Sequence, residues 1–181
     1  MVCGNICMHK EGKDFLRPGY AHGMIKSLDY LYGIGTMTFF GKREVYEKVP
    51  FDPEMPRWQD LEELIHIFES GYKIFFTDAV LIDYYEGKDS ISRSPQKGIA
   101  AFELILNKHP NIITHGKKLY SRLLRHRARY KMDCGEKDYN KDIKLAYQYN
   151  KNIKNFIWFI FSRIGLAKVA SKLARKIYMT E

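Results

Sequence analysis

The stretch from Phe51 to Ser92 constrains the fold more than any other part of this chain, because it carries a clear helical pattern followed by strand-like runs. Four apolar side chains recur at the spacing i, i+3, i+4 and i+7, which predicts a helix with one buried face: Leu61, Leu64, Ile65 and Phe68. Gly71 then stands where a left-handed helix cap is favoured. Tyr72–Thr77 and Val80–Tyr85 are rich in aromatic and branched residues, which predicts two strands.

The start of this helix gathers polar and aromatic groups in the run Arg57, Trp58, Gln59 and Asp60. A junction between a loop and a helix, backed by a sheet, holds a reactive side chain in a fixed position. Asp60 is therefore the candidate reactive carboxylate. The alternative is that Asp60 only complements the positive end of the helix dipole, as carboxylates in a first turn commonly do.

The remainder of the first 110 residues predicts short elements of both kinds. Strands are expected over Met1–Met8 and Met37–Phe40. Helices are expected over Met24–Tyr32, Lys42–Val49 and Pro95–Lys108. The last of these helices has Ser94 as its cap and a proline in its first turn, a typical helix start. The sequence therefore predicts an α/β protein.

The composition changes near residue 110, where we expect a boundary between residues 1–110 and a helical, basic extension over residues 111–181. Residues 1–110 hold 13 Lys/Arg and 16 Asp/Glu, whereas residues 111–181 hold 17 Lys/Arg and 5 Asp/Glu. The net charge of +9 thus belongs to the extension, which favours contact with a polyanionic surface over a uniformly basic nucleic-acid binder. Helices are predicted over Lys117–Lys131 and Glu136–Asn150, arranged as a hairpin.

The C-terminal end combines an aromatic cluster with a basic amphipathic pattern. The apolar run Phe156–Phe161 is far shorter than the roughly 20 residues that span a bilayer. Aromatic and basic side chains of this kind lie in the interface of an anionic membrane, and the candidates are Trp158, Phe159, Lys168, Lys172, Arg175 and Lys176. Two alternatives stay open. In one, the apolar residues at helical spacing beyond Gly165 pack on the helical hairpin, and in the other the basic extension binds nucleic acid. These apolar residues are Leu166, Val169, Ala170, Leu173 and Ile177.

The three cysteines, Cys3, Cys7 and Cys134, indicate a reducing compartment. Cys3 and Cys7 have a spacing that suits a metal or a strand-borne pair, but no second pair with metal-ligand spacing follows, so no metal site is predicted. The N-terminus lacks a charged head followed by an apolar run, the pattern of a secretory signal. We therefore expect a cytoplasmic protein, peripheral at the inner face of the membrane if the extension binds lipid.

The order of short motifs between residues 35 and 92 resembles the acceptor-side half of family 2 glycosyltransferases, which have the GT-A fold. The matching residues are Lys42-Arg43-Glu44, Phe51-Asp52, Pro56-Arg57-Trp58-Gln59-Asp60, Gly71–Phe76, Tyr84-Tyr85 and Ser90-Ile91-Ser92. The similarity covers about residues 1–95. Each motif is short, and it is their order and spacing together that carry the resemblance. The resemblance implies a partial GT-A-like fold, in which a mixed sheet is flanked by helices and the N-terminal nucleotide-binding half is absent.

The resemblance also implies roles for the residues at the helix start. Asp60 matches the family's general base, which takes the proton from an acceptor hydroxyl. Arg57 and Trp58 would frame a sugar acceptor, by charge and by stacking, beside Gln59, where many members carry Glu. The family's Asp-x-Asp, which holds Mg²⁺ or Mn²⁺ on the donor diphosphate, does not occur in this sequence. The expectation is therefore a chain that is inactive alone and that binds no cofactor alone.

Two functions from different classes follow from these patterns. The first is sugar transfer from a nucleotide-sugar donor to a glycan or a lipid-linked acceptor, completed by a donor-half partner and by Mg²⁺ or Mn²⁺. The second is a non-catalytic module that docks on a membrane or on a partner protein. Nucleic-acid binding ranks last, because the basic extension carries no recognisable reading motif.

Overall fold

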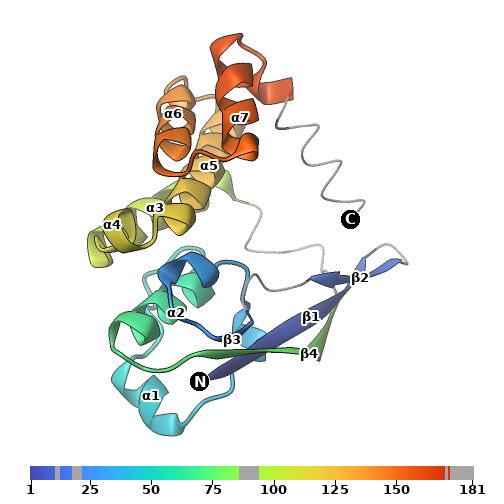
Figure 1. The fold of residues 1–181 in the computed structure, drawn as a ribbon, viewed down its shortest axis with the longest axis vertical. Coiled ribbons are helices and arrows are strands. Elements are labelled where there is room, and N and C mark those ends of the chain that lie inside the picture. The colour runs from blue at the N-terminus through green and yellow to red at the C-terminus, as the bar shows by residue number, and fades with distance from the viewer. Residues whose placement is uncertain (11–12, 18–21, 86–93, 170, 172–181) are drawn as a thin grey trace.

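The computed structural model describes residues 1–10, 13–17, 22–85, 94–169 and 171, and it places a small sheet beside a group of helices (Figure 1). The four strands are β1 (Val2–Lys10), β2 (Lys13–Arg17), β3 (Gly23–Met24) and β4 (Phe75–Tyr85), in the order β2-β1-β4-β3. β1 runs parallel to β4, while β2 and β3 pair antiparallel with their neighbours. The predicted α/β class with a mixed sheet is confirmed.

The two strands predicted over Tyr72–Thr77 and Val80–Tyr85 form one continuous strand, β4 (Phe75–Tyr85). The interruption that the sequence suggests is a bulge within that strand, because the register with β1 moves from Cys3 opposite Phe76 to Asn5 opposite Val80. The Asn5 side chain donates a hydrogen bond of 2.8 Å to the carbonyl of Asp78. This bond occupies a backbone acceptor that the bulge removes from the regular ladder.

The segment between β3 and α1 departs from the prediction. Met24–Tyr32 does not form a helix, because only a 3-10 turn, η1 (Leu28–Tyr30), follows β3. The predicted strand Met37–Phe40 is likewise replaced by the 3-10 turn η2 (Thr36–Thr38), with Phe40 in an isolated bridge to Val2. The path of the chain here is fixed by a few buried residues, among them Leu28 in η1 and Ile34 before η2.

α1 (Arg43–Lys48) and α2 (Gln59–Glu69) follow close to the predicted positions. Gly71 has φ +81°, as expected for the residue after a helix end. α2 is more deeply enclosed than its single apolar stripe indicates. Leu61, Leu64 and Ile65 are buried as predicted and Phe68 is half-buried, but Ile67 on another face of the helix is also fully buried. α2 is therefore a central helix, with protein on most of its circumference.

The second half of the chain is helical, with α3 (Pro95–Lys108), α4 (Ile112–His115), α5 (Lys117–Cys134), α6 (Tyr139–Tyr149) and α7 (Ile153–Arg163). The predicted cap of α3 is present, since the Ser94 hydroxyl accepts from the Lys97 amide. α5 and α6 form the predicted hairpin (Figure 1). The larger apolar core joins α2, α3 and α5, so Phe102 and Leu123, on either side of residue 110, belong to the same cluster.

A smaller core lies between α5, α6 and α7. Its buried members are Ala128, Met132, Ile143, Trp158 and Ala167. Among the helices of the described ranges, none combines the length and the apolarity needed to cross a bilayer.

Candidate functional site

The backbone of Trp58 turns the chain into α2 through a left-handed conformation, with φ 60° and ψ 32°. Positive φ is uncommon for a residue with a side chain, and a bulky residue held there stores roughly 1–3 kcal/mol of strain. The turn places Gln59 and Asp60 in the first turn of the helix immediately afterwards. Such a conformation persists only when the surrounding structure holds it, so the contacts of Trp58 decide the geometry of this junction.

Side chains of α5 hold the junction in place. The Trp58 ring lies 6.1 Å from the His126 ring in an edge-on arrangement and 5.9 Å from the Tyr130 ring. The Arg57 guanidinium lies 4.7 Å from the centre of the Tyr130 ring and donates a 3.2 Å hydrogen bond to the carbonyl of Ser94. The junction is thus fixed to α5 and to the start of α3 by aromatic and cation–π contacts.

The carboxylate of Asp60 is half-buried in this setting. One of its oxygens accepts a 3.0 Å hydrogen bond from the backbone amide of Leu61, and its place in the first turn puts it at the positive end of the helix dipole. The Gln59 side chain donates to the carbonyl of Met55 at 3.0 Å, which ties the helix start to the preceding loop. All four residues predicted at this site therefore lie together, and each of them has contacts that help to fix its position.

His126 on α5 is a member of the site that the sequence analysis did not identify. Its Nδ1 lies 2.6 Å from Nη2 of Arg129, and its Nε2 lies 2.6 Å from the hydroxyl of Tyr32. Because a guanidinium only donates, Nδ1 accepts, and Nε2 carries the proton that it donates to Tyr32. Burial, followed by the charges of the nearby arginines, holds the pKa of His126 well below its usual range, so the ring is neutral at pH 7.

Several arginines surround this neutral histidine and make the site cationic and aromatic. The charges that lower its pKa belong to Arg129, Arg125, Arg122 and Arg57, and the Arg122 guanidinium lies 4.8 Å from the centre of the Tyr32 ring. The available signal in the sequence was the spacing of Arg122, His126 and Tyr130, which are four residues apart and share one face of a helix. The arrangement suits ligands with hydroxyl groups, flat apolar faces or negative charge.

A buried polar network lies on another face of α2. The Glu62 carboxylate contacts Lys108 and accepts from His109 Nε2 at 3.0 Å, while His109 Nδ1 lies 2.7 Å from Glu69. Lys108 also contacts Asp52 at 2.9 Å, so the Phe51-Asp52 motif takes part in joining α2 to α3. Burial alone would raise the pKa of Glu62, but the hydrogen bonds from His109 and Lys108 outweigh it and lower that pKa.

Glu63, next along α2, is fully buried, and within the described part of the chain neither of its carboxylate oxygens has a hydrogen-bond partner. Burial, with a smaller contribution from the charge of Glu62, raises the pKa of Glu63 to about 7. The proton on this group is therefore retained to a much higher pH than on an ordinary glutamate. Glu63 lies on the enclosed side of α2, and its burial lowers the stability of the folded protein as the pH rises from 4.5 to about 7.

The residues predicted to meet a membrane are placed differently from one another. Trp158 is buried, with 7% of its surface exposed, in the small core between α5 and α7, so its ring packs inside the protein and does not face lipid. Phe159 is half-buried and stacks on Tyr147 at 5.3 Å. Lys168 is exposed, whereas Lys172, Arg175 and Lys176 lie outside the described residues. Trp158 therefore packs on the other helices and does not face a membrane, in agreement with the packing alternative.

A candidate metal-binding group lies on the sheet and not at the junction. Cys7, His9 and Asp83 are the candidate cluster in the described ranges, and Cys3, which the sequence paired with Cys7, lies in the apolar core. Hydrogen bonds to Asp83 and Asp14 raise the pKa of His9. A thiol and an imidazole are not the oxygen ligands that Mg²⁺ takes in proteins. The expected Mg²⁺ or Mn²⁺ of a complete glycosyltransferase does not fit this group.

Comparisons of this chain with protein-family models, with curated proteins and with solved structures found no match. The architecture defines an α/β protein with a mixed sheet and an α-helical second half.

Proposed function

We propose that this chain supplies the acceptor side of a family 2, GT-A-type sugar-transfer site, with Asp60 as the base that faces the acceptor hydroxyl. The observation that carries the proposal is the left-handed Trp58 turn, which is held by α5 and fixes Asp60 in the first turn of α2. Strained backbone of this kind clusters at functional sites, where an exact side-chain position matters more than local stability.

In an inverting transfer, the acceptor oxygen attacks the anomeric carbon of the donor sugar while a carboxylate takes the hydroxyl proton. The bond between that carbon and the nucleoside diphosphate breaks as the new glycosidic bond forms. Asp60 takes the proton in this scheme. Trp58 offers a ring edge or face to the acceptor sugar, and Arg57 provides charge beside it.

The donor diphosphate is held elsewhere in this proposal, because the sequence contains no Asp-x-Asp and the sheet cluster does not suit Mg²⁺. A separate donor half would supply the nucleotide site and its divalent cation. The chain alone is then expected to bind an acceptor glycan without turning over nucleotide sugars.

Acceptor binding tests the proposal. It is monitored by ¹H–¹⁵N NMR of the whole chain during titration with a panel of oligosaccharides and lipid-linked sugars. Shifts are expected at the Trp58 indole and at the amides of residues 57–61, and Trp58→Ala is expected to abolish them. Asp60→Asn removes the base while conserving shape, and Glu54→Gln, an exposed carboxylate of the same loop, is the matched control.

Shifts located away from the junction, or unchanged in Trp58→Ala, would overturn the acceptor assignment. A second measurement incubates the chain with nucleotide sugars, Mg²⁺ or Mn²⁺ and the acceptors. No product is expected from the chain alone, and robust turnover would contradict the proposal that a separate donor half is required. Turnover that survives in Asp60→Asn would remove Asp60 from the role of base.

A second candidate function, docking on an anionic membrane, is favoured by the exposed face of α7. Side chains at helical spacing along that face are exposed to between 40% and 72%: Ile153, Phe156, Ile157, Ile160 and Ile164. Exposed basic residues flank it: Lys151, Lys154, Arg163 and Lys168. An apolar stripe edged by cations is typical of helices that lie in the headgroup region of anionic lipid.

Sedimentation with vesicles tests this docking. Binding is expected to vesicles that contain anionic lipid, to weaken with salt, and to be lost in Ile157→Glu/Ile164→Glu. Val80→Glu alters an exposed apolar residue of the sheet and is expected to bind like the native chain. Binding by the double variant that equals that of the native chain would overturn the assignment to α7. Stronger binding to nucleic acid than to vesicles would show that nucleic acid, and not lipid, is the partner of this basic region.

A further inference from the structure

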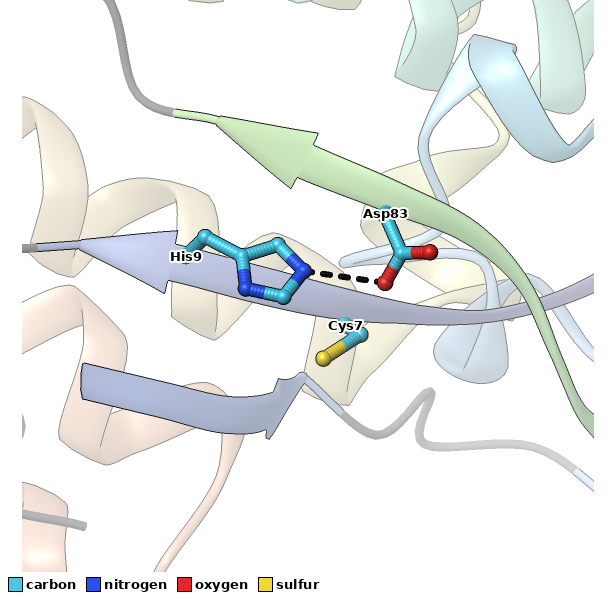
Figure 2. A group of neighbouring side chains, drawn as sticks. All are labelled: Cys7, His9 and Asp83. Carbon is cyan, nitrogen blue, oxygen red and sulfur yellow. Dashed lines mark hydrogen bonds and ion pairs between the residues drawn. The ribbon is translucent and has the colours of Figure 1, made fainter. Parts of the chain in front are cut away.

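Strand pairing brings four potential ligand residues together on one side of the sheet. Cys7 and His9 are two residues apart on β1, so their side chains share a face. The register places Asp83 of β4 opposite Cys7, and Asp14 of β2 opposite His9. Figure 2 shows Cys7, His9 and Asp83 directed toward one another from neighbouring strands. Asp83 is 74 residues from His9 in the sequence, and the pairing of β4 with β1 brings the two together.

The distances within this cluster are short. His9 Nε2 lies 2.9 Å from Oδ1 of Asp83, and His9 Nδ1 lies 2.6 Å from Oδ1 of Asp14. The ligand atoms of Cys7, His9 and Asp83 all lie within 4.8 Å of one another. Ligand atoms around a tetrahedral zinc ion lie roughly 3.3–3.8 Å apart, given metal–ligand bonds of about 2.0–2.3 Å. Small side-chain rotations therefore suffice to close the three atoms around one ion.

We propose that Cys7, His9 and Asp83 form a binding site for a zinc-type divalent transition-metal ion. A thiolate, an imidazole and a carboxylate are the three ligand types that zinc takes in proteins. The fourth position is left to water, because Asp83 and His9 have 66% and 20% of their side-chain surface exposed. The proposal does not rest on sugar transfer, since none of these residues belongs to the Asp60 junction.

Asp14 completes the arrangement as a positioning residue. Metal-bound histidines generally donate their other ring N–H to a carboxylate, which fixes the tautomer and orients the ring. The 2.6 Å contact between His9 Nδ1 and Asp14 provides this bond, so Nε2 is the nitrogen that faces Cys7 and Asp83. The Tyr85 ring stacks on the imidazole at 4.4 Å and restricts its rotation further.

The same residues suggest a cysteine nucleophile activated by histidine, and the geometry favours the metal site over it. A nucleophilic pair needs one imidazole nitrogen on the sulfur and the other on an orienting group. Both nitrogens of His9 contact carboxylates, Asp14 and Asp83. Two carboxylates and a thiol around one imidazole are instead a set of donors that a divalent cation brings together.

The experiment is titration of the chelator-treated full chain with Co²⁺ followed by absorbance, and with Zn²⁺ followed by calorimetry. One ion per chain and a thiolate-to-cobalt charge-transfer band are expected. Cys7→Ser is expected to lose the band, and His9→Gln and Asp83→Asn to weaken binding at least tenfold. Asp14→Asn is expected to weaken it by about 10–100-fold, as removal of an outer-shell partner usually does. Cys134→Ser, a half-buried cysteine elsewhere, is the matched control and is expected to bind like the native chain.

Far-UV circular dichroism of each variant separates loss of ligand from loss of fold, and Asp14 and Asp83 are exposed enough for their variants to fold. A charge-transfer band that persists in Cys7→Ser, or that disappears in Cys134→Ser, would overturn the site. A stoichiometry well below one, or equal competition by excess Mg²⁺, would overturn it as well.

Discussion

The Arg57 guanidinium lies 4.7 Å from the centre of the Tyr130 ring, and this contact joins the junction before α2 to α5. Tyr130 occupies space that Gly98 of α3 leaves open. A Cβ at residue 98 would lie 2.3 Å from the Tyr130 ring. The absence of a side chain on α3 therefore allows Arg57 and Trp58 to pack on α5.

We expect Gly98→Ala to destabilise the protein although alanine favours helices by about 1 kcal/mol over glycine. The new methyl group must displace Tyr130, so the loss from overpacking, about 1–3 kcal/mol, exceeds the gain in propensity. Urea unfolding measures the change. In Gly98→Ala/Tyr130→Ala the clash is removed, so the effects of the two changes should not add. Additive effects would contradict the clash.

Glu63→Gln is expected to stabilise the protein at pH 8 and to have little effect at pH 4. The folded-state pKa of Glu63 is raised from 4.5 to about 7, so the native chain loses stability as the pH rises between these values, where the folded state retains a proton that the unfolded state releases. The gain at pH 8 is about 3 kcal/mol, at 1.36 kcal/mol per pKa unit. Thermal unfolding across this pH range measures it, and a gain that is independent of pH would contradict the assignment.

His109→Gln tests the network between α2 and α3. Burial alone would lower the pKa of His109, but its hydrogen bonds to Glu62 and Glu69 outweigh it and raise that pKa above 6.5. The stabilisation from the protonated ring is therefore fully present below pH 6.5 and is lost as the pH rises through the folded-state pKa. We expect His109→Gln to destabilise most at pH 5–6. The exposed His22, changed in the same way, serves as the control, and a deficit that grows toward alkaline pH would refute the role of the charge.

Asp29→Ala is expected to cost about 1 kcal/mol, as loss of a helix cap usually does. One carboxylate oxygen accepts from the amides of Lys118 and Leu119 at 2.8 and 3.0 Å, 89 and 90 residues away. The residue that precedes α5 is Gly116, which has no side chain with which to cap. Chemical denaturation gives the loss, and amide exchange should quicken at residues 118 and 119. Unchanged exchange at these two amides would contradict the cap.

The buried salt bridge between Arg127 and Asp142 holds α5 against α6. Arg127 donates to both carboxylate oxygens, with Nε at 2.9 Å and Nη2 at 2.6 Å, and Asp142 is 2% exposed. Asp142→Asn should destabilise by about 3–5 kcal/mol, because it removes the buried counter-charge of Arg127 and leaves only the more exposed carboxylate of Glu103. Glu103→Gln, which alters the more exposed partner of Arg127, should cost less than 1 kcal/mol. Equal losses in the two variants would show that burial of the pair does not matter.

The sequence by itself determined the elements whose signals are local. The 3.6-residue pattern of α2, the Gly71 stop, the Ser94 cap of α3 and the α5–α6 hairpin were all predicted, because capping and hydrophobic spacing act within a few residues. It also singled out the Arg57–Asp60 run, since a charged and aromatic cluster at a helix start is visible without any partner.

Tertiary structure alone decided what surrounds those residues. His126 and Tyr130 become neighbours of Trp58 only because α5 packs on the junction. Trp158 of α7, a predicted membrane-surface residue, is enclosed because α7 packs on α5 and α6. The Cys7–His9–Asp83 cluster depends on the register of β4 beside β1. Pairing between distant segments is set by the summed burial of the whole core, and no local pattern encodes that sum.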